Sequence, residues 1–310
     1  MRFSVVIPLY NKQAHILDTL ASIAAQTHPA TEIIVVDDGS TDGGDRLVED
    51  LRDPAITLLR RSPPGPGGYA ARNMAIEAAR CEWIAFCDAD DIWMADHLAN
   101  LAHAATTTGD TVGCVFARAD IVSANGRRPY RIAGELLPAG AALSMGDIIK
   151  AWLATERCPL WTSAVAVKRD VLIGARLFPA GRARRGGDKD MWLRAVAASA
   201  SAYSPAITAE FHQDTENRVT RSTAHVDPPV LIETIAALIE TSAPGDRALL
   251  RALANQELAL YARHAAGKRS AVGARFLRAV YLPEGVPAMA RIMSYMLAVP
   301  MMRAIDAIRR

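Results

Sequence analysis

The chain has 310 residues and lacks the marks of several protein classes. Its four cysteines, Cys81, Cys87, Cys114 and Cys158, show no C-x-x-C spacing, so we expect reduced core thiols and neither a zinc site nor a disulfide framework. No uncharged apolar run reaches about 18 residues, which argues against a transmembrane span. The net charge is only +2, which gives no case for nucleic-acid binding.

Two further signals are missing near Met1. Met1 and Arg2 lead directly into a predicted strand, so no signal peptide is visible and we expect a cytoplasmic protein. No G-x-G-x-x-G follows that strand, which disfavours a classical dinucleotide-binding enzyme. Pro8-Leu9-Tyr10-Asn11 stands there instead. The alternative enzyme class is a metal-dependent nucleotidyltransferase, which would usually have a glycine-rich loop with Lys or Arg directly after the first strand. Because Pro8-Leu9-Tyr10-Asn11 occupies that position, the sequence argues against a nucleotidyltransferase.

The first half of the chain alternates apolar runs with helical patterns. Strands are expected at Phe3–Pro8, Glu32–Val36, Ile56–Leu59 and Trp83–Phe86, with helices at Ile16–Ala24, Asp42–Leu51, Tyr69–Ala79 and Leu98–Ala105. This alternation predicts an α/β fold with a mostly parallel sheet flanked by helices. Ligands in such sheets bind outside the carboxyl ends of the strands, where Pro8–Asn11, Asp37–Asp38 and Asp88–Asp91 all fall.

The second half is less regular. Strands are expected at Val112–Ser123, Trp161–Val167 and Ile207–His212, helices at Ser144–Ala154 and Asp188–Ala198, and a hairpin turn at Asn125-Gly126. From about Asp227 the pattern is helical throughout. We therefore predict a catalytic domain at 1–222 and a C-terminal helical extension at 223–310.

The stretch Cys87-Asp88-Ala89-Asp90-Asp91 follows the predicted Trp83–Phe86 strand. Carboxylates at a strand's end are costly to bury and do not serve the core. They suit a hard divalent cation, which prefers oxygen ligands and commonly brings phosphate with it. A solvated turn with an aspartate capping the next helix would leave the same pattern, so the sequence keeps both interpretations open.

Five pieces of the chain together resemble the family-2 glycosyltransferases of the GT-A fold. They are Ser4–Asn11, Ile33–Ser40, Ala71-Arg72-Asn73, Phe86–Asp91 and Gly187–Arg194, in this order. The resemblance covers about the first 220 residues. It implies an inverting transfer of a sugar from a nucleotide-diphosphate sugar, with a UDP-sugar favoured, to a glycan, lipid-linked or other hydroxyl acceptor. It also implies Mn²⁺ or Mg²⁺ as cofactor and a role in cell-surface polysaccharide or glycoconjugate synthesis.

The resemblance assigns nucleotide-binding roles residue by residue. Asp38 would accept a hydrogen bond from the base, and Pro8, Tyr10 and Asn11 would shape the nucleoside pocket. Arg72 would reach the diphosphate or base, and Asp88 and Ala89 would lie beside the sugar nucleotide. Ordinary interpretations stay open for three of them: a helix cap for Asp38, a core position for Tyr10, and a surface arginine for Arg72.

The same resemblance places the metal and the general base. Asp90 would bind the metal, with Asp88 near the ribose or the metal's waters and His212 as a third ligand or phosphate contact. Asp188 would be the base, and Asp190 is the second candidate. The family usually has Glu-Asp where this chain has Gly187-Asp188, which keeps open a catalytically silent nucleotide-sugar-binding or scaffold protein.

Two basic segments have no fixed role. Arg182, Arg184 and Arg185 form either a lid over the diphosphate or acceptor, or a solvated loop. The last helix, Pro287–Arg310, carries five of the ten methionines, and the chain from Lys268 onward has a local net charge of +6. This helix would lie at the inner face of a membrane, pack on the catalytic domain, or contact a second copy.

Overall fold

The computed structural model describes residues 1–215 and 227–308. The strands are β1 (Phe3–Leu9), β2 (Glu32–Asp37), β3 (Ile56–Arg60), β4 (Trp83–Phe86), β5 (Ile92–Trp93), β6 (Val112–Ser123), β7 (Gly126–Pro129), β8 (Val165–Lys168) and β9 (Ala200–His212). The helices are α1 (Ile16–Ala24), α2 (Gly44–Asp50), α3 (Tyr69–Ala78), α4 (His97–Thr108), α5 (Met145–Thr155), α6 (Arg169–Gly174), α7 (Gly187–Ala198), α9 (Leu231–Thr241), α10 (Pro244–Gly267), α11 (Ala274–Arg278) and α12 (Val286–Ile308). Short 3₁₀ turns lie at Pro66–Gly68, Gly134–Leu136 and Thr162–Ala164.

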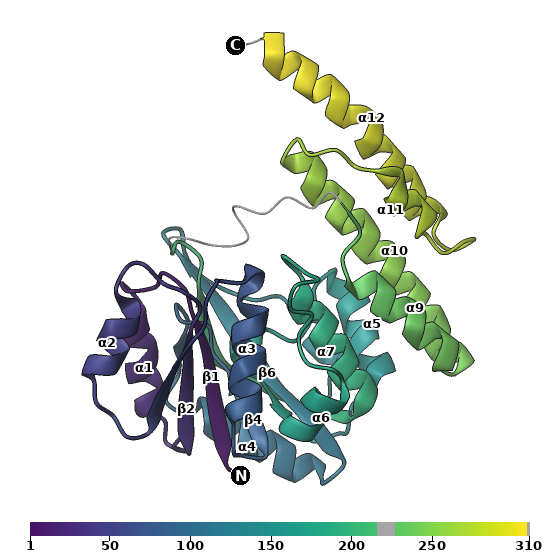
Figure 1. The fold of residues 1–310 in the computed structure, drawn as a ribbon. Helices are drawn as coiled ribbons and strands as arrows, with labels where there is room; N and C mark the ends of the chain where they lie inside the picture. Colours follow the sequence, from purple (N-terminus) through teal and green to yellow (C-terminus); the bar gives the residue numbers. More distant parts are fainter. Residues whose placement is uncertain (216–226, 309–310) are drawn as a thin grey trace.

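The described strands form one sheet in the order β3-β2-β1-β4-β8-β6-β9-β5, with β7 paired to β6. Strands β1 to β4 pair in parallel, as the alternating pattern predicts. Strand β8 runs antiparallel to both β4 and β6, whereas β6 and β9 pair in parallel. The α/β fold class is confirmed, and helices cover the sheet on both sides (Figure 1).

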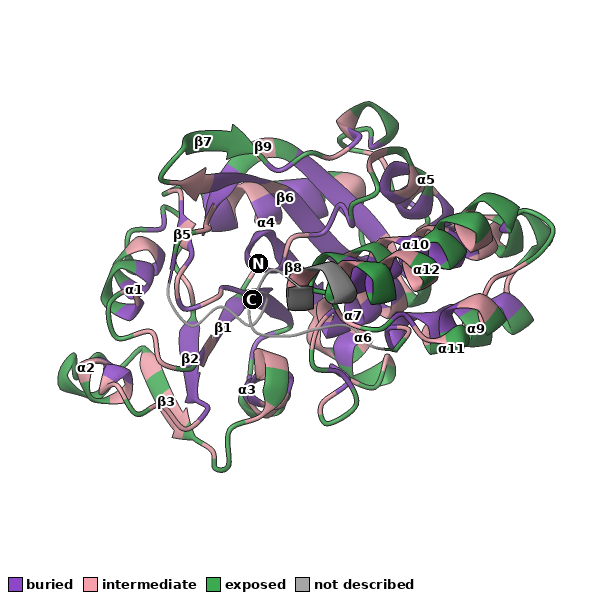
Figure 2. Cartoon of the chain, turned by 90° about the horizontal axis from the view of Figure 1, so that it is seen from above, coloured by how far each residue is buried: buried purple, intermediate pink, exposed green. Residues whose placement is uncertain are grey.

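Alternate residues of the central strands enter two separate cores. On β1, Val5 and Ile7 pack with α1 and α4, while Val6 packs with α3 and α7 on the other face. This is the two-residue period of a strand, and both faces are apolar because helices cover both. Figure 2 shows the resulting buried centre inside exposed outer helix faces. The four cysteines are buried and free in the described structure, as expected.

Two predicted strands have different bounds. Trp161–Val167 is a 3₁₀ turn at Thr162–Ala164 followed by β8, because Ser163 turns back to bond Asp91 instead of continuing the ladder. The strand predicted at Ile207–His212 begins at Ala200. Its register shifts against β6 near Arg118, so the side-chain alternation that would reveal its full length is broken.

The C-terminal helices share the core of the catalytic half. Leu250, Leu253 and Leu258 of α10 are fully buried in the same cluster as Trp152 of α5 and Trp192 of α7. Figure 1 shows α10 lying across α5 and α7, with α12 extending beyond it. The boundary predicted at 222 lies outside the described residues. None of the helices described is both long and apolar enough to cross a membrane.

Candidate functional site

A cavity of about 1200 Å³ opens at the carboxyl ends of β1, β2 and β4. The predicted site residues that line it are Pro8, Tyr10, Asp38, Arg72, Asp88, Ala89, Asp90 and Asp188. Asn11 and His212 do not line it. Six of these residues lie at or just after the ends of β1, β2 and β4, and they share the cavity with Arg72 of α3 and Asp188 of α7.

Asp38 lies at the end of β2 and is 2% exposed. Its carboxylate forms an ion pair with Arg61, and both its oxygens accept from the Gly65 N–H at 3.2 Å. Burial raises the pKa of Asp38, while Arg61 and Gly65 oppose that rise. It does not cap a helix, because α2 begins only at Gly44. Asp38 is thus an acceptor group held in the cavity wall.

The turn after β1 orders the same end of the cavity. Tyr10 is 44% exposed, so its interpretation as a core residue is wrong. Asn11 adopts φ +50°, a left-handed conformation that Asn tolerates, and its Oδ1 accepts from the Thr41 N–H at 2.8 Å. Asn11 therefore ties the turns after β1 and β2 together without lining the cavity itself.

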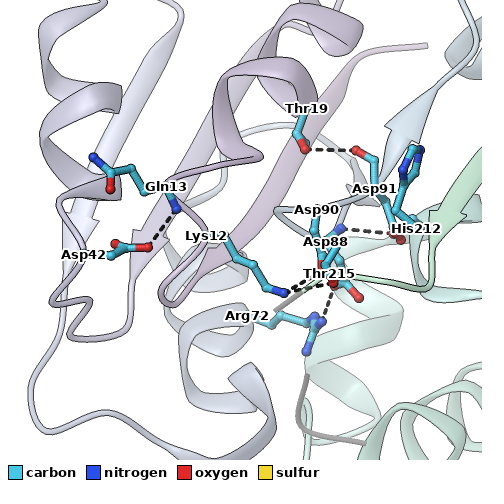
Figure 3. A network of polar contacts seen from close by, with 11 residues as sticks. Lys12, Gln13, Thr19, Asp42, Arg72, Asp88, Asp90, Asp91, His212 and Thr215 are labelled. Atoms are coloured by element: carbon cyan, nitrogen blue, oxygen red, sulfur yellow. Dashed lines mark hydrogen bonds and ion pairs between the residues drawn. The ribbon is translucent and has the colours of Figure 1, made fainter. Parts of the chain in front are cut away.

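Asp88 and Asp90, which form the D-x-D motif Asp88-Ala89-Asp90, each have a cationic partner (Figure 3). Arg72 is 6% exposed and forms an ion pair with Asp88 and a 2.9 Å hydrogen bond to the Gly67 carbonyl, which excludes a surface role. Lys12 Nζ lies 2.6 Å from Asp90 Oδ2, which also accepts from the Thr215 hydroxyl at 2.6 Å. Burial raises the pKa of Asp88, and Arg72 opposes the rise.

Asp91 is fully buried and joins three elements. It accepts from the Ser163 hydroxyl at 2.5 Å and from the His212 N–H at 3.3 Å, and its carbonyl accepts from Thr19. Burial, with Asp88 and Asp90 close by, raises its pKa well above the usual range. Asp91 therefore fixes the turn that presents Asp88 and Asp90, and it caps no helix.

The donor set fits a divalent cation only together with phosphate. Among residues 1–215 and 227–308, no three His, Cys, Asp or Glu side chains are grouped to hold a metal. The His212 ring instead lies 3.2 Å from Glu210. Asp88 and Asp90 supply two hard oxygen ligands, and Mg²⁺ or Mn²⁺ commonly completes its shell with water and substrate phosphates. These two aspartates are thus the residues that would hold the ion.

Asp188 lies in the first turn of α7 and differs from its neighbour Asp190. Asp190 is 1% exposed, forms a 2.6 Å ion pair with Arg194 and accepts from Thr234. Asp188 faces the cavity, and no residue in the described parts of the chain bonds to its carboxylate. The structure thereby separates the two candidate bases: Asp190 has a structural role and Asp188 is available.

The glycine before Asp188 has a packing reason. A Cβ on Gly187 would lie 2.8 Å from both the Tyr69 ring and Pro179. The Tyr69 hydroxyl accepts from the Gly187 N–H at 2.9 Å, and burial, with Asp188 nearby, raises the Tyr69 pKa. The side chain of Tyr69 occupies the space that the family's usual glutamate would need.

Helix α10 forms a wall of the cavity that the sequence patterns do not reveal. Leu260, Tyr261, Arg263 and His264 line it. Below them, the fully buried Glu257 forms a 2.8 Å ion pair with Lys189, the residue after Asp188. No motif marks these residues, since the resemblance stops near residue 220. Lys12 was also missed, although its place directly after Asn11 could have suggested it.

Three aromatic side chains stand in the cavity between these regions. The ring of Trp161 lies 4.9 Å from that of Tyr130 and 4.5 Å from that of Phe211. Among the described residues, the buried Trp161 indole N–H has no hydrogen-bond partner. Aromatic faces suit a sugar ring, because the C–H face of the sugar is apolar.

Relatives and solved structures agree with this geometry. The chain is 34% identical over 184 residues to an uncharacterized glycosyltransferase of Nostoc sp., which covers 58% of this chain and 54% of that one. It is 40% identical over 100 residues to the putative teichuronic acid biosynthesis glycosyltransferase TuaG of Bacillus subtilis. That alignment covers 31% of this chain and 38% of TuaG. The chain thus spans about half or less of the length of these relatives.

Two solved structures share the fold. The structure of S. aureus TarS 1–349 with UDP-GlcNAc superposes with a TM-score of 0.68 at 19% identity, covering 99% of this chain and 92% of that one. The structure of the mannosyltransferase PcManGT of Pyrobaculum calidifontis with GDP-Man and Mn²⁺ superposes with a TM-score of 0.60 at 22% identity. The match covers 98% of this chain and 87% of that one. The sequence pattern of "Glycosyl transferase family 2" matches residues 4–172, more than half of the chain, and the chain belongs to this family.

Proposed function

We propose that this chain transfers a sugar from a nucleotide-diphosphate sugar, with a UDP-sugar favoured, to a hydroxyl acceptor, with inversion at the anomeric carbon. The observation that carries the proposal is the unpartnered Asp188 carboxylate in the same cavity as Asp88 and Asp90. TarS, which shares the fold, has been solved with UDP-GlcNAc and with UDP, which supports this donor class.

The strand ends would hold the donor. Asp38 is buried yet borders the cavity, so its carboxylate can accept from the N–H of a uracil ring. Arg72 is fixed by Asp88 and Gly67, and its guanidinium presents a planar donor fork to the diphosphate. Pro8 and Tyr10 shape the nucleoside slot, and Ala89 leaves room for the donor between the two aspartates.

Asp90 would bind Mn²⁺ or Mg²⁺, with Asp88 beside it. The ion would offset the charge that builds on the leaving diphosphate. Lys12 now pairs with Asp90, so the ammonium group must move when the ion binds. His212 as a third ligand stays a prediction, and the proposal rests on the two aspartates.

Asp188 would act as the general base. The acceptor hydroxyl transfers its proton to Asp188 while its oxygen forms a bond to the anomeric carbon. The bond from that carbon to the diphosphate oxygen breaks, and the nucleoside diphosphate leaves from the opposite face. A positioned base of this kind typically contributes about 10²–10⁴-fold to the rate.

The donor is tested by a thermal-shift screen of UDP-, GDP- and other nucleotide-sugars, each with and without Mn²⁺. A ligand that binds only the folded chain must raise the melting temperature. We expect the largest rise for a UDP-sugar with Mn²⁺. If no nucleotide-sugar raises it, the donor assignment is wrong. Sugar transfer from a labelled donor then separates an enzyme from a silent binding or scaffold protein, the alternative that Gly187 suggested.

We further propose peripheral membrane contact through α12, in cell-surface polysaccharide synthesis. Met293, Leu297 and Met301 lie on one face at intervals of four residues and are 48%, 76% and 64% exposed. The segment from Lys268 onward is strongly basic, which favours anionic headgroups. Two relatives support this setting by their names: TuaG is a putative glycosyltransferase of teichuronic acid biosynthesis, and WfaP of Escherichia coli, 34% identical over 100 residues, is a glucosyltransferase with a diphosphoundecaprenol-linked acceptor.

A further inference from the structure

Four arginines line the side of the cavity that is built by α10 and two neighbouring loops. Arg157 follows α5, Arg184 and Arg185 precede α7, and Arg263 lies on α10. We call these four residues the basic rim. Lys189, which pairs with the buried Glu257, and His264 line the same region, where the acidic side chains that line the cavity are Asp188 and Glu156. Positive charge therefore exceeds negative charge beside the proposed base.

The rim arginines differ from the other arginines around the site. Arg61 and Arg72 form ion pairs with Asp38 and Asp88, and Arg182, two residues before Arg184, is paired with Glu233 at 2.5 Å. Within the described ranges, none of the four rim guanidinium groups has a carboxylate partner. The Arg157 guanidinium carbon lies 5.7 Å from the centre of the Tyr130 ring. The rim thus supplies guanidinium groups without a carboxylate partner among the residues that line the cavity.

His264 lies close to several of these positive charges. Its pKa is lowered to about 4, first by burial and then by Arg185, Arg263, Lys189 and Lys268. Positive charges from the loop before α7, from α7 and from α10 therefore lie close to His264. Holding like charges together costs free energy, which an anion bound between them would recover.

We propose that the acceptor is anionic and carries a phosphate or diphosphate group that binds the basic rim. This rests on the proposed function, because the rim lies beside Asp188 and would hold the acceptor as its hydroxyl reaches that base. Guanidinium forks match phosphate oxygens in pairs and stay charged at any working pH. The Trp161 and Tyr130 faces next to Arg157 would take the sugar that bears the reacting hydroxyl.

The test measures binding by calorimetry with UDP and Mn²⁺ present in excess, so that the donor end is filled. The ligands are an alkyl diphosphate-linked N-acetylglucosamine, a short glycerol phosphodiester oligomer, and the neutral alkyl glycoside of the same sugar. We expect the two anionic ligands to bind at least about tenfold more weakly to Arg185→Gln/Arg263→Gln than to the unmodified chain. The stronger of the two identifies a lipid diphosphate or a phosphodiester polymer as the source.

The matched control is Arg182→Gln/Arg247→Gln, which removes the same charge from the same loop and helix but outside the cavity. It should bind all ligands normally. Equal binding of the anionic ligands by the rim variant, or no binding by the unmodified chain, overturns the proposal. If the rim variant loses as much affinity for UDP as for the anionic ligands, these arginines belong to the donor site, and this result also overturns the proposal.

Two further measurements keep the outcomes separate. If the rim variant does not fold, sodium chloride replaces it: anion affinity of the unmodified chain must fall steeply with salt, and affinity for the neutral glycoside must not. If the unmodified chain binds the anionic ligands but never UDP, the proposed function fails while the rim remains an anion site.

Discussion

At the strand ends, every carboxylate that lines the cavity has a cation beside it: Arg61 with Asp38, Arg72 with Asp88, and Lys12 with Asp90. Along α10 and the adjoining loops, the rim arginines and Asp188 have no such partners among the described residues. The carboxylates at the strand ends are therefore already paired without a ligand, whereas the charges on the α10 side are the ones that we propose an acceptor would pair with. The family match, at residues 4–172, covers the organised side.

Asp188→Asn should show the largest effect. The amide is nearly isosteric but cannot take a proton at neutral pH, so turnover should fall about 10²–10⁴-fold while donor binding is kept. Turnover at saturating donor measures this. Asp190→Asn serves as the comparison and should instead destabilise the fold, because it weakens the pair with Arg194. Near-normal turnover of Asp188→Asn would show that the base lies elsewhere.

Asp90→Ala should abolish the contribution of metal to nucleotide binding. The carboxylate would be the ion's main protein ligand, and it has no core role, so the fold should persist. Calorimetry of UDP with and without Mn²⁺ checks this: the two affinities should become equal in the variant. A folded variant that keeps the full Mn²⁺ effect would remove Asp90 from the metal site.

Glu257→Ala should lower the stability of the fold relative to the unmodified chain. It leaves the Lys189 ammonium without its counterion and the Trp152 indole N–H without its acceptor, in a position with no exposure. We expect a loss of about 2–4 kcal/mol in the free energy of unfolding, measured with urea. Glu233→Ala breaks an exposed pair with Arg182 and should cost about 0.5 kcal/mol or less. Similar losses in both variants would show that the buried pair is unimportant.

Leu297→Gln/Met301→Gln should weaken sedimentation with anionic vesicles about tenfold without changing turnover on water-soluble substrates. The control is Leu51→Gln/Leu136→Gln, two exposed leucines outside α12. If the unmodified chain does not bind vesicles at low salt, the membrane proposal fails and α12 has a packing or dimer role.

His97 and His264 both have lowered pKa values, but a bound anion should change only the pKa of His264. Burial lowers the pKa of His97 to about 3 and that of His264 to about 4, so the ring of each is neutral at pH 7. Below pH 6.5 the histidines of the unfolded chain bind protons that the folded rings do not, so the free energy of unfolding should decrease as the pH is lowered from about 6.5 to about 4 for His264 and to about 3 for His97. In an NMR titration, the anionic acceptor ligand should raise the pKa of His264 by on the order of one unit and leave His97 unchanged.

The sequence by itself determined the strands β1 to β4, the helices between them and the end of the sheet at which the cavity opens. These follow from local patterns, since buried parallel strands are continuous apolar runs and their polar ends stand out. It also named Asp38, Arg72, Asp88, Asp90 and Asp188, because each stands in a motif of the family.

Tertiary structure alone decided which charges are paired. Asp188 and Asp190 are equivalent acidic residues in the sequence, and only the packing of α9 and Arg194 against Asp190 distinguishes them. The rim joins residues about 100 positions apart, from Arg157 to Arg263, and no periodicity along the chain records such a distant contact. An ion pair depends on distances of a few ångströms between side chains, which local pattern cannot specify because they arise only when the helices pack on the sheet.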